Sequence, residues 1–180
     1  MGRKAHIFCA IHKYSMVRLF AALLITFFLV EEATSRTVYI HSDYGGKITD
    51  YDKRLRRYKR RKDHLIVDGT CMSACVRFMS VENICATDRG YFYFHGVTGQ
   101  YGELLYDASV EDSREYDLPK AYALEEKYDA FGFHRTTNPG PKEEVVEEGV
   151  SIVYQQMYAD PSKYMKFLKV RANLIVPRCR

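Results

Sequence analysis

The stretch that decides the fold is residues 65–75, which read Leu-Ile-Val-Asp-Gly-Thr-Cys-Met-Ser-Ala-Cys. Leu65–Val67 is a short apolar run closed by Asp-Gly, a pattern typical of a buried strand. The residues after it are small or polar and predict a sharp turn that opens a helix over Ser73–Ser80. The stretch therefore predicts a strand–turn–helix unit with Ser73 at the turn.

The segments around this unit repeat the alternation of strand and helix. Thr37–His41 predicts a strand that ends at the Gly45-Gly46 turn. One apolar stripe at spacings of three and four then predicts a helix, through Ile48, Tyr51, Leu55 and Tyr58. Two more short strands are expected at Ile84–Ala86 and Tyr91–Phe94. Such alternation is typical of an α/β fold with a parallel sheet.

The pattern changes after His95. We expect an extended polar loop over Gly96–Glu115 and a helix over Lys120–Ala130. A helix of about sixteen residues is predicted by the spacing of Val146, Val150, Val153 and Met157. A last short helix is predicted to begin at Pro161-Ser162 and to fade near Val170. The carboxyl-terminal part is therefore expected to be helical.

The length and charge of the chain limit its class. The 180 residues suit one domain, and 47% hydrophobic with 28% charged residues excludes wholesale disorder. The net charge of +4 is uneven, because Lys53–Lys62 holds eight basic residues whereas Glu103–Glu148 holds 13 acidic and 5 basic ones. The basic run fits a solvated helix face, a membrane surface, or the acidic region of a second copy. No nucleic-acid partner is expected, because the aromatic residues lie on the apolar stripe.

The first 35 residues have the layout of a secretory signal peptide. Four basic residues and no acid precede Leu19–Val30, a twelve-residue run that is apolar apart from Thr26. Twelve helical residues reach about 18 Å, short of a hydrocarbon core of about 30 Å. We expect cleavage after Ser35, which leaves 36–180 as a single exported domain, periplasmic or secreted. The alternative is an uncleaved anchor that holds the domain at a membrane.

Four cysteines remain in the expected mature chain, namely Cys71, Cys75, Cys85 and Cys179. In an exported protein they predict two disulfides, for which three pairings are open. The alternative is a zinc site completed by His64 or His95, although no Cys-x-x-Cys pair is present. Neither a metal nor a cofactor is expected.

Candidate catalytic residues lie between Gly45 and His95. Ser73 is placed at the start of a helix, where the N–H of Ala74 favours a negative oxygen. His95, at the end of an aromatic strand, is the candidate base that would activate the serine. A second oxyanion donor could come from Gly46 or Lys47. The plainer alternatives are a helix-capping serine, a histidine bonded to backbone, and an ordinary glycine turn.

These residues resemble a known family. Gly45-Gly46 after a strand, Ser73 in a small-residue turn and His95 after the next strands are similar to the Clp protease proteolytic subunit and its crotonase-superfamily relatives. The segments Gly69–Cys75, Ile84–Thr87 and Phe94-His95 resemble uncharacterised exported bacterial members of that superfamily, and the resemblance covers about sixty residues, Thr37–Gly96. The resemblance implies a parallel-sheet core of ββα-type units with Ser73 as nucleophile, His95 as base, and the N–H groups of Gly46 and Ala74 as oxyanion hole. It also implies self-association.

The chain departs from the family pattern at two places. Cys75 stands where the Clp pattern has glycine, and Lys169 or Val170 stands where it has the acid of the triad. The acids that could replace it are Glu143, Glu144 and Asp160. The resemblance implies an exported serine hydrolase that acts on a peptide or ester. The alternative is a non-catalytic secreted binding or scaffold protein that retains the fold.

Overall fold

A computed structural model describes residues 35–99, 103–115, 119–133, 135–136, 143–156 and 163–180. All of them belong to one compact unit, Ser35–Arg180. The predicted signal segment, apart from Ser35, lies outside these residues. No helix in the described ranges has the length and apolar character needed to cross a membrane.

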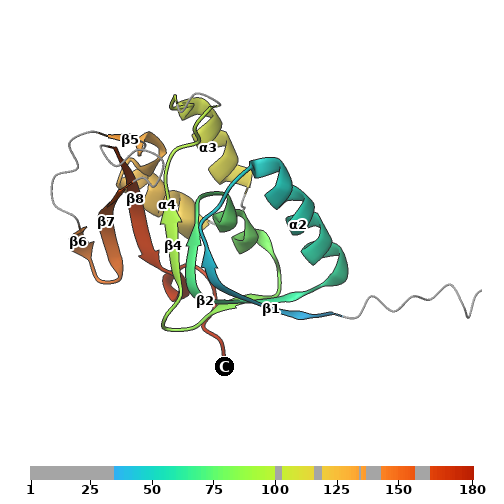
Figure 1. Ribbon diagram of the computed structural model, residues 1–180. Coiled ribbons are helices and arrows are strands. Elements are labelled where there is room, and N and C mark those ends of the chain that lie inside the picture. Colours follow the sequence, from blue (N-terminus) through green and yellow to red (C-terminus); the bar gives the residue numbers. More distant parts are fainter. Residues whose placement is uncertain (1–34, 100–102, 116–118, 134, 137–142, 157–162) are drawn as a thin grey trace, which may run out of the picture. The chain divides into compact units, whose positions relative to one another are not determined.

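The described unit is a mixed α/β fold (Figure 1). Its strands are β1 (Thr37–Asp43), β2 (His64–Met72), β3 (Ile84–Ala86), β4 (Tyr91–Phe94), β5 (Arg135–Thr136), β6 (Glu143–Glu147), β7 (Val150–Gln156) and β8 (Tyr164–Arg171). Its α-helices are α2 (Ile48–Arg61), α3 (Tyr106–Glu115) and α4 (Pro119–Lys127). Its 3₁₀ helices are η1 (Ser73–Ser80), η2 (Ala130–Gly132) and η3 (Ala172–Leu174).

The strands form one eight-stranded sheet in the order β1-β2-β4-β8-β7-β6, with β3 beside β2 and β5 beside β8. Strands β1, β3 and β4 each pair with β2 in parallel. Every pairing beyond β4 that the structure describes is antiparallel. The predicted parallel sheet is therefore confirmed for the first half of the domain, and the sheet as a whole is mixed.

The predicted helical carboxyl-terminal part is wrong. Strands β6 and β7 replace the helix expected over Val146–Met157, and β8 replaces the one expected before Val170. Gly149 adopts a φ of 75°, and the pairing of Glu147 with Val150 closes a tight hairpin around it. A left-handed residue of this kind ends a helix but suits a hairpin turn.

Of three predictions between these regions, two need smaller corrections and one is confirmed. The helix at Ser73–Ser80 is present but is a 3₁₀ helix. The expected loop Gly96–Glu115 contains helix α3 at Tyr106–Glu115. The helix expected at Lys120–Ala130 is confirmed as α4, with η2 following at its end.

The core lies mainly between the sheet and the helices α2 and η1. Phe78 of η1 is fully buried, with ring centroids 5.3 Å from Tyr51 and 5.2 Å from Tyr58 of α2. Since side chains alternate across a strand, Phe92 and Phe94 join this core while Tyr93 packs near Phe167 in a smaller cluster. The core thus fixes the ends of β2 and β4, where the candidate residues follow.

Two disulfides connect the four remaining cysteines. The short disulfide joins Cys71 to Cys75, and the long disulfide joins Cys85 to Cys179 across 94 positions of sequence. Bridged cysteines offer no thiolate to a metal, so the zinc alternative is wrong, and the described residues hold no cluster of three or more metal-ligating side chains. Two disulfides indicate an oxidising, extracytoplasmic setting.

Candidate active site

One pocket of about 460 Å³ lies where three parallel strands end. Gly46 follows β1, Ser73 follows β2 directly and His95 follows β4 directly. The carboxyl ends of parallel strands commonly carry the binding site of an α/β fold. The lining residues are Gly46, Lys47, Ile48, Thr49, Ser73, Ala74, Val76, Phe94, His95, Val97, Thr98, Ser109, Glu125 and Phe131. The structure therefore gathers in one pocket the four residues that the sequence singled out.

Ser73 has an uncommon backbone conformation for its residue type. Its φ is 56°, in the left-handed region, and it sits between the extended Met72 and helix η1. Met72, not Ser73, is the N-cap of the helix, and no side chain caps it. The helix-capping alternative for Ser73 is therefore wrong. Among the described residues, no hydrogen-bond partner occupies its hydroxyl, which remains available to a ligand.

The glycine turn after β1 packs directly against the turn at Ser73. A Cβ placed on Gly45 would lie 2.6 Å from the Cβ of Ser73 and 2.7 Å from the carbonyl oxygen of Met72. The φ of Gly45 is 81°, so both the conformation and the close approach require glycine. A Cβ on Gly45 would also lie 3.1 Å from the backbone nitrogen of Ala74, so the two turns form one unit at the end of the sheet, and both Gly46 and Ala74 line the pocket.

Two backbone N–H groups of this unit are available to a ligand. The N–H of Gly45 is used, because it donates to Oδ1 of Asp43 at 3.1 Å. The N–H groups of Gly46 and Ala74 meet no acceptor within the described part of the chain. Ala74 lies in the first turn of η1, where backbone N–H groups lack partners inside the helix. These are the two groups that the sequence predicts as an oxyanion hole.

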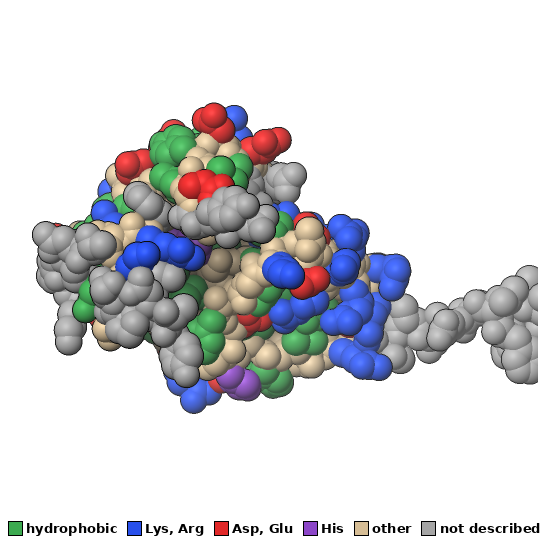
Figure 2. Space-filling view, turned by 45° about the horizontal axis from the view of Figure 1, so that its top comes forward, with side chains coloured by type: hydrophobic (Ala, Val, Ile, Leu, Met, Phe, Trp, Pro, Cys, Tyr) green, Lys and Arg blue, Asp and Glu red, His purple; other side chains and the backbone are tan. Residues whose placement is uncertain are grey.

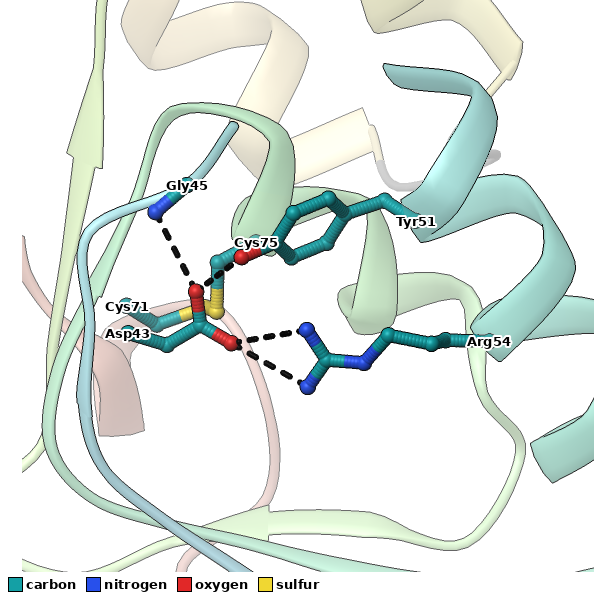
Figure 3. The surroundings of a disulfide bond; sticks show 6 residues. All are labelled: Asp43, Gly45, Tyr51, Arg54, Cys71 and Cys75. Carbon is teal, nitrogen blue, oxygen red and sulfur yellow. Dashed lines mark hydrogen bonds and ion pairs between the residues drawn. A yellow bond between two sulfur atoms is a disulfide. The ribbon is translucent and has the colours of Figure 1, made fainter. Parts of the chain in front are cut away.

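Asp43 holds the glycine turn and helix α2 together beside the short disulfide (Figure 3). Its Oδ1 accepts hydrogen bonds from Gly45 and from the hydroxyl of Tyr51. Both terminal nitrogens of Arg54 donate to its Oδ2 at 3.2 Å. Burial and the contact with Asp43 raise the pKa of Tyr51 to about 12, so this phenol stays protonated and keeps donating. Asp43 therefore fixes the turn that carries Gly46 to helix α2.

His95 has the electronic state that a general base needs. Its Nδ1 lies 2.6 Å from the carbonyl oxygen of Gly96 and donates to it, which leaves Nε2 as an acceptor. Burial lowers the pKa of His95 below its ordinary 6.5, so the ring is neutral at pH 7. The alternative of a histidine bonded to the backbone is therefore confirmed, and the same histidine also lines the pocket.

Gly96 positions the histidine, a role that the sequence analysis missed. Its N–H donates to the carbonyl oxygen of Phe133 at 2.7 Å. A Cβ at Gly96 would come within 2.2 Å of the carbonyl oxygen of Phe131, so the backbone passes too closely for any side chain. The glycine directly after the candidate base was the signal that could have revealed this.

The far wall of the pocket was also missed. Ser109 of α3 and Glu125 of α4 line the pocket, although both are almost fully buried. Ser109 accepts the N–H of Val97 at 2.7 Å and donates to Leu105 at 2.8 Å, which fixes the segment after His95 against the pocket. Nothing in the sequence places residues so distant along the chain beside Ser73.

Neither of the two described acids that were expected as a third catalytic residue, Glu143 and Glu144, lines the pocket. Glu143 on β6 pairs with Lys169 of β8 at 3.0 Å, and Glu144 lies beside it on β6. Asp160 lies outside the described residues. The histidine is thus oriented by the carbonyl of Gly96 and not by Glu143 or Glu144.

No family model matches the chain, and neither a curated protein nor a solved structure is similar to it. The chemistry of the pocket must therefore be inferred from its own residues.

Proposed function

We propose that this chain is an exported serine hydrolase of the Clp and crotonase type, which cleaves a peptide or ester by acyl transfer. Ser73 is the nucleophile, His95 the general base, and the N–H groups of Gly46 and Ala74 stabilise the oxyanion. In this proposal the first 35 residues direct export, in keeping with the two disulfides.

The observation that carries the proposal is the conformation of Ser73 in the shared pocket. A serine with a φ of 56° is strained, and strained residues gather at functional sites. A serine on a sharp turn between a strand and a helix presents its hydroxyl to the end of the sheet, as nucleophilic serines do. Here the same turn supplies an unused N–H group, and the same pocket contains a neutral histidine.

The reaction begins when Oγ of Ser73 attacks the substrate carbonyl carbon while Nε2 of His95 takes the hydroxyl proton. The carbonyl oxygen becomes an oxyanion, to which Gly46 and Ala74 donate. The intermediate then collapses, and His95 returns the proton to the leaving amine or alcohol. Water, deprotonated by the same Nε2, then attacks the acyl-serine, and His95 gives that proton to Oγ of Ser73 as the C–O bond breaks and the acid is released. Each oxyanion donor contributes roughly 3–4 kcal/mol in comparable enzymes.

The carbonyl of Gly96 takes the place of an orienting acid. It selects the same histidine tautomer that a carboxylate would, because Nδ1 donates in both cases. A neutral carbonyl stabilises the imidazolium less than a carboxylate does, and loss of the acid from a triad costs roughly 10⁴ in rate. We therefore expect slow turnover compared with a complete triad.

The pocket suits a small acyl group. Its volume of about 460 Å³ falls in the range of ordinary ligand sites. Apolar side chains from four elements or their flanks face it, namely Ile48, Val76, Phe94 and Phe131. Glu125 and Lys47 are the acidic and basic side chains of this lining, beside the neutral His95. An aliphatic or aromatic acyl group is therefore the expected occupant.

The direct test is hydrolysis by the segment from Arg36 onward, expressed in an oxidising compartment, with a panel of nitrophenyl esters and fluorogenic peptides. Ser73→Ala and His95→Gln should each abolish turnover. Ser80→Ala is the matched control, because Ser80 ends the same helix and its hydroxyl donates to the carbonyl oxygen of Arg77 at 3.0 Å, outside the pocket. Unchanged hydrolysis by Ser73→Ala on every responsive substrate would refute the proposal. A folded wild type that is inert throughout would favour the non-catalytic binding protein.

A further inference from the structure

Helix α2 carries most of its positive charge on the side that faces away from the core. Tyr51 and Tyr58 are buried against Phe78, and Leu55 lies on the same stripe. Side chains at the intervening positions point to solvent, since residues three and four apart share a helix face. Four exposed residues of the helix, together with Lys62 at its C-cap, form what we call the basic face: Arg56, Arg57, Lys59, Arg60 and Lys62. Basic side chains gather over this part of the molecule (Figure 2).

Some basic residues of this helix have an acidic partner among the described residues, and others have none. Arg54 pairs with Asp43 at 3.2 Å and Arg61 with the buried Asp63 at 3.5 Å. Lys53 lies 3.6 Å from Asp50. The five residues of the basic face have no acidic partner among the described residues. Five positive charges therefore lie unpaired within about 9 Å of helix length, since each residue adds 1.5 Å.

We propose that the basic face binds an anionic lipid surface. Five clustered cations match the negative charge of phospholipid headgroups. The face presents no exposed aromatic or apolar side chain, because both tyrosines of the helix are buried. It therefore lacks the stacking platforms that single-stranded nucleic acid requires and the wedges that a bilayer-inserting helix uses. An extracytoplasmic domain with such a face would bind lipid headgroups through charge alone.

This surface is separate from the pocket, so the inference does not depend on the proposed function. The two are nevertheless connected through one helix. Ile48 and Thr49 in the first turn of α2 line the pocket, and the basic face begins two turns later. Binding through the face would hold the pocket within about 20 Å of the membrane, the length of a 14-residue helix. A membrane-associated substrate would then be within reach.

The test uses the segment 35–180, which contains every described element, the core and both disulfides. Its binding to phosphatidylcholine vesicles with one third phosphatidylglycerol is measured by co-sedimentation, with pure phosphatidylcholine beside it. The variant Arg56→Gln, Arg57→Gln, Arg60→Gln is compared with a control of equal net charge, Lys120→Gln, Arg135→Gln, Arg180→Gln. The control positions are exposed and lie on α4, β5 and the carboxyl terminus.

We expect the wild type to bind the anionic vesicles only, and more than tenfold more weakly at about 300 mM than at about 50 mM salt. The basic-face variant should lose about 100-fold in affinity, because it removes three cations and each cation near an anionic surface contributes roughly fivefold. The control should lose less than about threefold.

Three results would overturn the inference. Equal losses in the two triple variants would show that net charge, and not the basic face, governs binding. Binding to pure phosphatidylcholine, or binding that salt leaves unchanged, would point to an apolar contact. Absence of lipid binding together with tight binding of a single-stranded oligonucleotide, or with a dimer in light scattering that the basic-face variant abolishes, would assign the face to another partner.

Discussion

Replacing Ser73 with glycine should stabilise the protein while it removes the activity. The φ of Ser73 is 56°, and the left-handed region costs an L-residue roughly 1–2 kcal/mol. Glycine adopts it freely but loses roughly 0.5–1 kcal/mol more backbone entropy on folding. The hydroxyl has no hydrogen bond to lose among the described residues. The net gain is therefore about 0.5–1 kcal/mol, equivalent to roughly 1–4 °C in Tm for a domain of this size.

The assay is urea unfolding of wild type, Ser73→Gly and Ser73→Ala, followed by circular dichroism in the oxidised state. Ser73→Ala is the control, because alanine keeps the left-handed cost and should leave the free energy of unfolding within about 0.5 kcal/mol of wild type. Both variants should be inactive. A Ser73→Gly protein that is less stable by about 1 kcal/mol or more would refute the reasoning, since the turn would then need a side chain for structural reasons.

Four other perturbations test the supports of the site. Removing the short disulfide by Cys→Ser at both positions should cost about 2 kcal/mol in urea unfolding and abolish hydrolysis, because this five-residue loop encloses Ser73. Removing the long disulfide should cost about 4–5 kcal/mol but leave hydrolysis intact in the fraction that folds; the opposite pattern would contradict the account. Burial lowers the pKa of His95, so hydrolysis should persist below pH 6.5 and fail only as the pH falls through the lowered pKa. A rate that already falls with decreasing pH above 6.5 would exclude His95 as the base. The same shift should weaken folding as pH drops below 6.5, since the unfolded chain then binds the proton more readily. Gly45→Ala should lower the free energy of unfolding by roughly 2–4 kcal/mol and abolish hydrolysis, because its Cβ would lie 2.7 Å from the carbonyl oxygen of Met72. A stable, active variant would show that the two turns move independently.

The sequence predicted the first half of the fold well because its signals there are local. Leu65–Val67 lies in β2, the stripe through Tyr51 and Tyr58 lies on α2, and the Gly45-Gly46 turn connects β1 to α2. Parallel strands joined by helices bring their carboxyl ends to one edge, so the order of the residues was sufficient to place Ser73 and His95 together. The pocket confirms that placement.

The prediction for the second half of the domain is wrong where a helical spacing of apolar residues coincides with two short strands. Val146, Val150 and Val153 have helical spacing, yet they also belong to two short strands separated by a turn. Gly149 and the β-branched run after it favour a hairpin, and this signal was outweighed by the apolar spacing. Strand β8 buries side chains on both faces, so it shows neither a clean alternation nor a helical stripe.

The supports of the candidate site could not be predicted for a different reason. The carbonyl of Gly96 that orients His95 is a backbone group, and a search for an acid overlooks it. Glu125 reaches the pocket through the packing of α4, which no local pattern encodes. Long-range contacts of this kind depend on the whole fold.

The most direct test of the central claim is covalent labelling of Ser73. The segment 36–180, with both disulfides formed, is treated with a fluorophosphonate, and the modified residue is identified by peptide mass spectrometry. An activated serine displaces fluoride and gains one phosphonyl group, so we expect stoichiometric modification at Ser73 and none in Ser73→Ala or His95→Gln. A folded, oxidised protein that stays unmodified, or one modified equally in Ser73→Ala, would contradict the claim that Ser73 is a nucleophile.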